Sequence, residues 1–184
     1  MDVVASILWR RLGSPGHDAC RLEQHCDGWS LDGAAVFLDD NGDVARLGYR
    51  VRCDEAWQAV SARLHGFVGR RTVDLDLFRD DGRWLNHGAV IAGIDDLIDL
   101  DLGFTPATNT CAIRRLQLAG GQGTSTAAWL DPKTLTFSPL PQTYVPSSSS
   151  SWSYASPRHD FKAELVVDDH GLVVDYPGLW VAER

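Results

Sequence analysis

Short segments of alternating apolar and polar residues recur along this chain, and each of them ends in turn-forming residues. Val44–Cys53 has a clear period of two and follows the turn sequence Asp39-Asp40-Asn41-Gly42. A second pair of such segments, Lys162–Val167 and Leu172–Tyr176, flanks Asp168-Asp169-His170-Gly171. Alternation of this kind is typical of half-buried strands, and tight turns of this composition connect antiparallel neighbours. The sequence therefore predicts a mainly β protein built from consecutive hairpins.

The composition supports this interpretation. Good helix formers are scarce, with 4 Glu, 2 Lys and 1 Met among 184 residues, whereas 7 Trp and many Val, Thr, Phe and Tyr favour pleated surfaces. A chain of this length is close to one typical domain of about 150 residues. We therefore expect a single domain that spans residues 1–184.

Further strands are expected wherever the same alternation appears between turn residues. The segment Asp54–Leu64 fits either a short helix or a strand, and the hairpin spacing on both sides favours a turn at Asp54–Ala56 followed by a strand. The other expected strands are Ala5–Leu12, Asp18–His25, Trp29–Leu38, Asp74–Phe78, Thr124–Leu130, Gln142–Val145, Trp152–Ser156 and Leu179–Ala182.

The middle of the chain has a different pattern. Ile94–Leu100 carries Ile94, Leu97 and Ile98 at helical spacing. After a segment rich in Thr, Pro and Gly, Asn109 or Thr110 is positioned to cap a second short helix. One or two short helices are therefore expected near residues 94–118.

Charge and hydropathy exclude several function classes. The formal net charge of −8 disfavours a nucleic-acid binder and attachment to an anionic membrane surface. The longest apolar stretch is shorter than the roughly 18 residues of a membrane-spanning helix. The segment Met1–Trp9 lacks the basic start and small-residue cleavage site of a secretory signal, so a cytoplasmic location is expected.

No motif predicts a metal site, a cofactor site or a nucleophile. His17, Cys20, His25 and Cys26 lack the spacing of a zinc site, and their strand separates them. All four cysteines are expected to be thiols; the surroundings of Cys111 could lower its pKa, but a small buried side chain is the better interpretation. No phosphate-binding loop, dinucleotide fingerprint or serine-hydrolase elbow is present. No catalytic residue and no cofactor are predicted.

Two pairs of charged residues carry alternative interpretations. Asp99 and Asp101 lie on one strand face and could act as a carboxylate pair for glycoside chemistry. Arg114 and Arg115 could hold an anion or sugar hydroxyls. The plainer alternative is that one arginine pairs with an aspartate to stabilise the fold and the other is solvated.

The central segment resembles a bacterial family described as putative glycolipid-binding. The resemblance lies in Asp99–Thr110 with Ile113-Arg114-Arg115-Leu116, and it extends to Gly16–Glu23, Tyr49–Asp54, Ala127–Leu130 and the ending Gly171–Val173 with Tyr176–Trp180. Cys111-Ala112 departs from the expected Leu-Pro. The resemblance implies a fold similar to the lipoprotein carriers LolA and LolB, in which a curved antiparallel sheet forms an incompletely closed barrel, a β-roll. It implies no catalytic residues.

These observations predict a non-catalytic protein that binds a lipid or glycolipid in an apolar cavity. The ligand-binding residues are expected to be Asp99, Asp101, Phe104, Thr105, Asn109, Arg114, Arg115, Trp84, Tyr144 and Trp180. The segment Asp99–Arg115 is expected to cross the open side of the sheet and frame the entrance, or else to serve only as a folding lock. Two alternatives stay open: a small hydrolase or sugar-active enzyme that uses the Asp and Arg pairs, and a scaffold without a ligand.

Overall fold

The strands of this protein form one continuous sheet that curls but does not close into a barrel. The computed structural model describes residues 1–183. The sheet has 15 strands in the order β8-β7-β6-β5-β4-β3-β2-β1-β15-β14-β13-β12-β11-β10-β9, and about 61% of the chain is strand. The two edges, β8 and β9, are not paired with each other. This confirms the expected mainly β, curved and incompletely closed architecture.

The first half of the sheet follows the predicted hairpins. Its strands are β1 (Asp2–Arg11), β2 (Gly16–His25), β3 (Gly28–Leu38), β4 (Val44–Cys53), β5 (Ala59–Val68), β6 (Arg71–Asp80), β7 (Arg83–Asn86) and β8 (Ala89–Val90). The turn between β3 and β4 shows why: the Asp39 carboxylate accepts the backbone N–H groups of Asn41 and Asp43, and Gly42 adopts a φ of 81°. The turn after Asp54 and the strand that follows it are also confirmed.

The second half returns to the middle of the sheet. It contains β9 (Asp99–Leu102), α1 (Asn109–Leu118), β10 (Gly123–Asp131), β11 (Thr136–Pro146), β12 (Ser151–Ser156), the 3₁₀ helix η1 (Pro157–His159), β13 (Phe161–Val167), β14 (Val173–Tyr176) and β15 (Trp180–Ala182). The chain begins at β1, reaches one edge at β8, crosses to the other edge at β9 and ends at β15, which pairs with β1.

Three local predictions need correction. Ile94–Leu100 does not form a helix, because Asp96 has a left-handed φ of 59° and its N–H donates to the Gly82 carbonyl. The sheet is not antiparallel throughout, since β9 pairs in parallel with β10. The residue that caps α1 is Thr108 rather than Asn109 or Thr110, and its hydroxyl accepts the Leu102 N–H at 3.2 Å instead of a helical donor.

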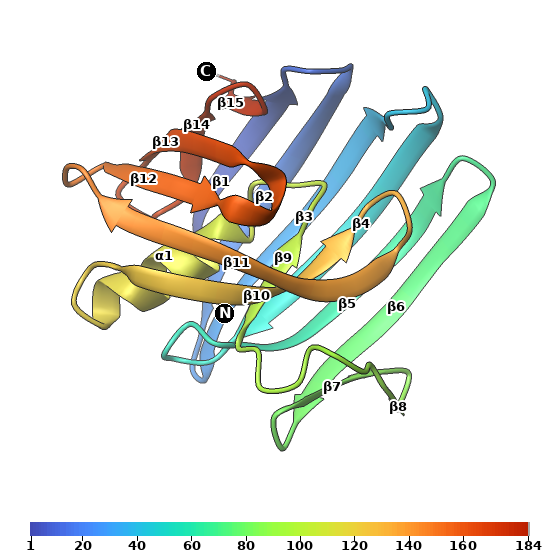
Figure 1. Cartoon of the computed structure of the whole chain (residues 1–184), viewed down its shortest axis with the longest axis horizontal. Coiled ribbons are helices and arrows are strands. Elements are labelled where there is room, and N and C mark those ends of the chain that lie inside the picture. The colour runs from blue at the N-terminus through green and yellow to red at the C-terminus, as the bar shows by residue number, and fades with distance from the viewer. Residues whose placement is uncertain (184) are drawn as a thin grey trace.

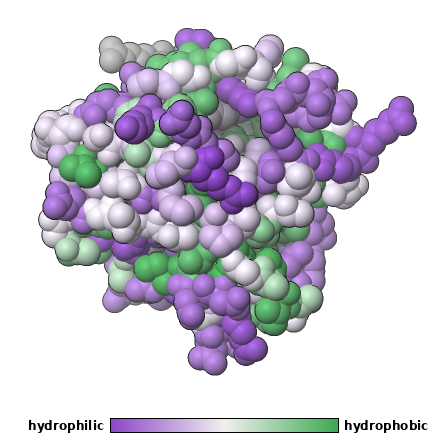
Figure 2. Space-filling view, in the orientation of Figure 1, coloured by the Kyte–Doolittle hydropathy of each residue, from purple (hydrophilic) through white to green (hydrophobic). Residues whose placement is uncertain are grey.

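The core lies between the two halves of the curled sheet. Figure 1 shows β1–β6 behind and β10–β13 crossing in front of them, with α1 beside both. Trp9, Trp84 and Trp152 are fully buried there, and α1 adds Ile113 and Leu116. Most of the concave interior is therefore filled by side chains. On the face shown in Figure 2, hydrophobic residues form separate patches among hydrophilic ones.

Candidate functional site

A cavity of about 230 Å³ opens where the central segment meets the strands of the second half. Its lining combines aromatic rings with polar groups from β9, α1, β10, β11, β12, η1, β13 and β14. The lining residues are Asp101, Gly103, Thr105, Asn109, Trp129, Leu140, Tyr154, Ser156, His159, Phe161, Tyr176 and Leu179. Convergence of a few polar groups on an apolar, concave wall is the usual composition of a small-molecule site.

A larger hollow of about 570 Å³ has no aromatic residue in its lining. It lies over β1, β2 and β3, where the exposed side chains of Leu8, Arg21 and Ala34 contribute to its lining. Such a depression on the outer surface of a sheet has neither an aromatic wall nor a buried hydrogen-bonding floor. The smaller cavity is therefore the better candidate.

A chain of hydrogen bonds forms the polar floor of the cavity. The Asn109 Nδ2 donates to the Tyr144 hydroxyl at 3.0 Å, and that hydroxyl donates to Gln142 Oε1 at 3.1 Å. Gln142 Nε2 in turn donates to Asp101 Oδ2 at 2.6 Å. Burial raises the pKa of the Asp101 carboxyl to about 6, and the hydrogen bond from Gln142 opposes this only in part. The floor thus holds one carboxylate in a fixed orientation.

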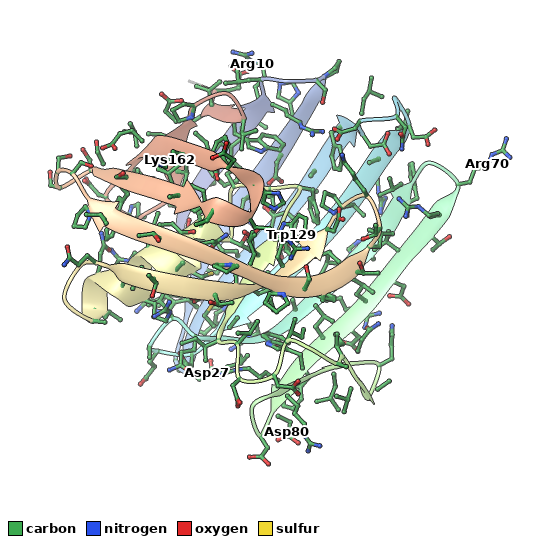
Figure 3. The ribbon with its side chains drawn as sticks, in the orientation of Figure 1. Arg10, Asp27, Arg70, Asp80, Trp129 and Lys162 are labelled. Atoms are coloured by element: carbon green, nitrogen blue, oxygen red, sulfur yellow. The ribbon has the colours of Figure 1, made fainter. Side chains whose placement is uncertain are left out.

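The opposite wall is aromatic. Tyr154, Phe161 and Tyr176 pack against one another with ring centroids 5.8 to 6.2 Å apart. Trp129 meets the ring of His159 edge-on at 5.1 Å. In Figure 3 the Trp129 label lies near the middle of the molecule, whereas Arg70 and Asp80 project at the periphery. Aromatic faces of this kind attract C–H groups and cations and disfavour anions.

Ser156 adds a hydroxyl to the lining. Ser156 is 2% exposed. Its Oγ forms no well-directed hydrogen bond with the described residues, although the Tyr154 phenol lies close enough to interact with it. A hydroxyl has one donor and two acceptor sites, so Ser156 Oγ keeps hydrogen-bonding capacity for a ligand atom beside its interaction with Tyr154.

The structure brings three of the predicted site residues to this cavity, namely Asp101, Thr105 and Asn109. Tyr144 lies directly behind Asn109. Thr105 also donates to the buried Asp18 carboxylate, which accepts a second hydrogen bond from the Tyr49 hydroxyl at 2.9 Å. The central segment therefore lines the cavity on one side and is tied to the first half of the sheet on the other.

The remaining predicted residues lie outside the lining. The Arg115 guanidinium forms a bidentate ion pair with Asp99, which also accepts the Ser125 hydroxyl. The Arg114 guanidinium lies 5.7 Å from the Trp57 ring. Phe104 packs against Phe37 and Tyr49, Trp84 donates from Nε1 to the Leu97 carbonyl at 2.8 Å, and Trp180 is buried in the core.

Several cavity residues were not predicted. Tyr154, Phe161 and Tyr176 alternate with their neighbours as ordinary core residues would, so no sequence signal separates them from the core. Asp18 did carry a signal, because its position in the alternation places a carboxylate on the inward face with Cys20 and Leu22. Cys111 is buried beside Cys53, with the two sulfurs 3.4 Å apart, and its pKa is raised rather than lowered.

Comparison with known proteins places this architecture in a family. A sequence model of the family described as "Putative glycolipid-binding" matches residues 6–182. The chain belongs to this family. The crystal structure of a DUF1089 family protein from Pseudomonas aeruginosa is 32% identical and has a TM-score of 0.79, over 93% of each chain.

A second solved structure shares the fold. It is the β-barrel-like protein of a domain of unknown function, DUF1849, from Brucella abortus, with 11% identity and a TM-score of 0.57 over 97% of this chain and 95% of that one. No curated protein matches the chain. No helix within residues 1–183 is long and apolar enough to cross a membrane.

Proposed function

We propose that this protein binds a glycolipid without transforming it, and that the polar headgroup enters the cavity beside Asp101. The observation that carries the proposal is the combination of an aromatic wall with a hydrogen-bonded polar floor. A sugar ring has apolar C–H faces that stack on aromatic rings, and hydroxyl groups that need fixed donors and acceptors. Trp129 and Tyr176 supply the first kind of contact, and Asp101 and Asn109 supply the second.

The size of the cavity supports a headgroup rather than a whole lipid. A volume of about 230 Å³ is below the range of roughly 300–1,000 Å³ of sites for drug-sized ligands. The interior between the sheet halves is filled by Trp9, Trp84 and Trp152, so it offers no long apolar channel. We therefore expect the acyl chain to leave past Leu179, which lines the cavity and is 39% exposed.

Titration calorimetry with a short-chain neutral glycolipid, such as an alkyl glucoside below its micellar concentration, tests the proposal. Trp129→Ala removes one aromatic wall and is expected to weaken binding about tenfold or more. Phe78→Ala is the matched control, because Phe78 is a 56% exposed aromatic residue on β6 outside the cavity. Absence of binding to the wild type over a panel of alkyl glycosides, or equal loss in both variants, would contradict the proposal.

An enzyme is the second candidate, because a carboxyl with a raised pKa in a cavity is a common feature of acid–base catalysts. Glycoside hydrolysis, however, needs two carboxyl groups that flank the scissile bond. Asp101 lines the cavity, but Asp99 is held by Arg115 and does not line it. Release of a chromophore from aryl glycosides, abolished by Asp101→Asn, would favour catalysis over binding.

A further inference from the structure

The charges around the cavity are unbalanced. Asp101 is its one carboxylate, and neither lysine nor arginine lines it within the described chain. Of the two nearest arginines, Arg115 is neutralised by its ion pair with Asp99. Arg158 keeps its charge, because it donates to the neutral Ser138 hydroxyl at 2.8 Å and the Pro139 carbonyl at 3.0 Å, but it is exposed, lies 5.6 Å from the Trp129 ring and forms no ion pair with Asp101.

The two tyrosines of the aromatic wall carry no charge. Burial raises the pKa of the Tyr154 and Tyr176 phenols, so both are neutral near pH 7. His159 contributes an imidazole whose ring contacts Trp129. The Tyr154, Phe161 and Tyr176 part of the wall is therefore neutral and rich in π electrons, which stabilises a cation better than an anion.

Asp101 itself has an unused acceptor. Its Oδ2 accepts the Gln142 amide, whereas no described residue donates to Oδ1. The Tyr144 hydroxyl has spent its single proton on Gln142, and the one hydrogen bond from the Asn109 amide goes to Tyr144 rather than to Asp101. The raised pKa of this carboxyl agrees with a negative charge that lacks a cationic partner.

We propose that the headgroup carries a cationic amino group, as an amino sugar does, and that this ammonium binds Asp101 Oδ1. This inference rests on the proposed function and narrows its ligand class. The ammonium supplies the missing charge and a donor for the free oxygen, while the sugar ring lies against the aromatic wall. An anionic headgroup, such as a phosphate or a uronic acid, would meet the Asp101 charge and the π faces in a cavity whose lining contains no lysine or arginine.

The test compares three probes on the wild-type protein at pH 7 and low salt: an alkyl 2-amino-2-deoxyglucoside, its N-acetylated derivative and the plain alkyl glucoside. A charge-assisted hydrogen bond is roughly twice as strong as a neutral one. The amino probe is therefore expected to bind about tenfold more tightly than either neutral probe, and N-acetylation should remove that advantage.

Asp101→Asn keeps the side-chain shape and removes the charge, so the affinity ratio of amino to neutral probe should fall to about one. Asp80→Asn, an exposed carboxylate at the end of β6, is the matched control and should leave the ratio unchanged. The probe series on the wild type gives an answer even if Asp101→Asn folds poorly.

The outcomes separate the two proposals. If the neutral probes bind and the amino probe has no advantage, the cationic headgroup is refuted and glycolipid binding stands. An unchanged ratio in a folded Asp101→Asn variant would also refute the role of Asp101. If no probe binds to the wild type, both proposals are wrong.

Discussion

The ion pair between Asp99 and Arg115 allows a sharp test of what the two adjacent arginines do. The Asp99 side chain is 3% exposed and that of Arg115 is 16% exposed, and the pair joins β9 to α1. Arg115→Ala leaves a buried carboxylate with only the Ser125 hydroxyl as a side-chain partner. Removal of one member of a buried pair costs about 3–5 kcal/mol. For a domain of this size 1 kcal/mol corresponds to about 2–4 °C, so Tm should fall by about 10 °C.

Arg114→Ala provides the control within the same helix turn. Arg114 contacts the Trp57 ring and donates to Gln117 Oε1 at 3.2 Å. It forms no ion pair with a buried carboxylate of the described residues. Loss of such a cation–π contact costs about 0.5–1 kcal/mol. The free energy of unfolding, measured with urea at pH 7, should therefore separate the two variants by at least about 2 kcal/mol.

A double variant shows whether the stability lost in Arg115→Ala comes from the unpaired Asp99 carboxylate. Addition of Asp99→Asn to Arg115→Ala removes the buried carboxylate and should recover part of the lost stability. The reasoning is refuted if Arg115→Ala is no less stable than Arg114→Ala. If Arg115→Ala keeps its Tm but loses glycolipid affinity, Arg115 belongs to the binding site and not to a folding lock.

Two further predictions concern buried groups. Burial raises the pKa of Asp18 from 3.8 to about 6, so the folded protein holds this proton more tightly than the unfolded chain, and the resulting stability is complete below about pH 4 and lost as the pH rises through 6. The free energy of unfolding of Asp18→Asn minus that of the wild type should therefore be roughly 3 kcal/mol larger at pH 8 than at pH 4. Denaturant unfolding of both proteins at the two pH values checks this, and a stability difference that does not change with pH would contradict it. Cys26 is exposed whereas Cys20, Cys53 and Cys111 are buried, so a thiol reagent should modify one thiol in the native protein and four after unfolding, and fast modification of more than one would contradict the burial.

The sequence predicted the hydrogen bonds of the central segment only in part. The density of Thr, Asn and Asp indicated local hydrogen bonding, and the hydroxyls of Thr105 and Thr108 do accept the nearby N–H groups of Ala107 and Leu102. The long-range partners could not be predicted, because the bonds Tyr49–Asp18, Asn109–Tyr144 and Thr105–Asp18 join residues 31, 35 and 87 positions apart. Period-two alternation fixes which face a residue occupies but not which strand will lie opposite.

Local chemistry by itself determined the strands and turns of this protein. Asp39 and Asn41-Gly42 form their turn through bonds between near neighbours, and the alternation in Val44–Cys53 assigns its inward residues without knowledge of the rest of the chain. Where a local pattern was weak, as in Ile94–Leu100, contacts with Gly82 and Trp84 replaced the expected helix.

Tertiary structure alone decided the closure of the sheet and the site. The parallel pairing of β9 with β10 and the pairing of β15 with β1 join strands that no turn connects directly. Arg114 and Arg115 are adjacent in the sequence, yet successive helical positions point about 100° apart, so one contacts Trp57 and the other Asp99. Asp101 meets Gln142 across 41 residues. Such contacts depend on how the whole sheet curls, and no short stretch of sequence encodes that curvature.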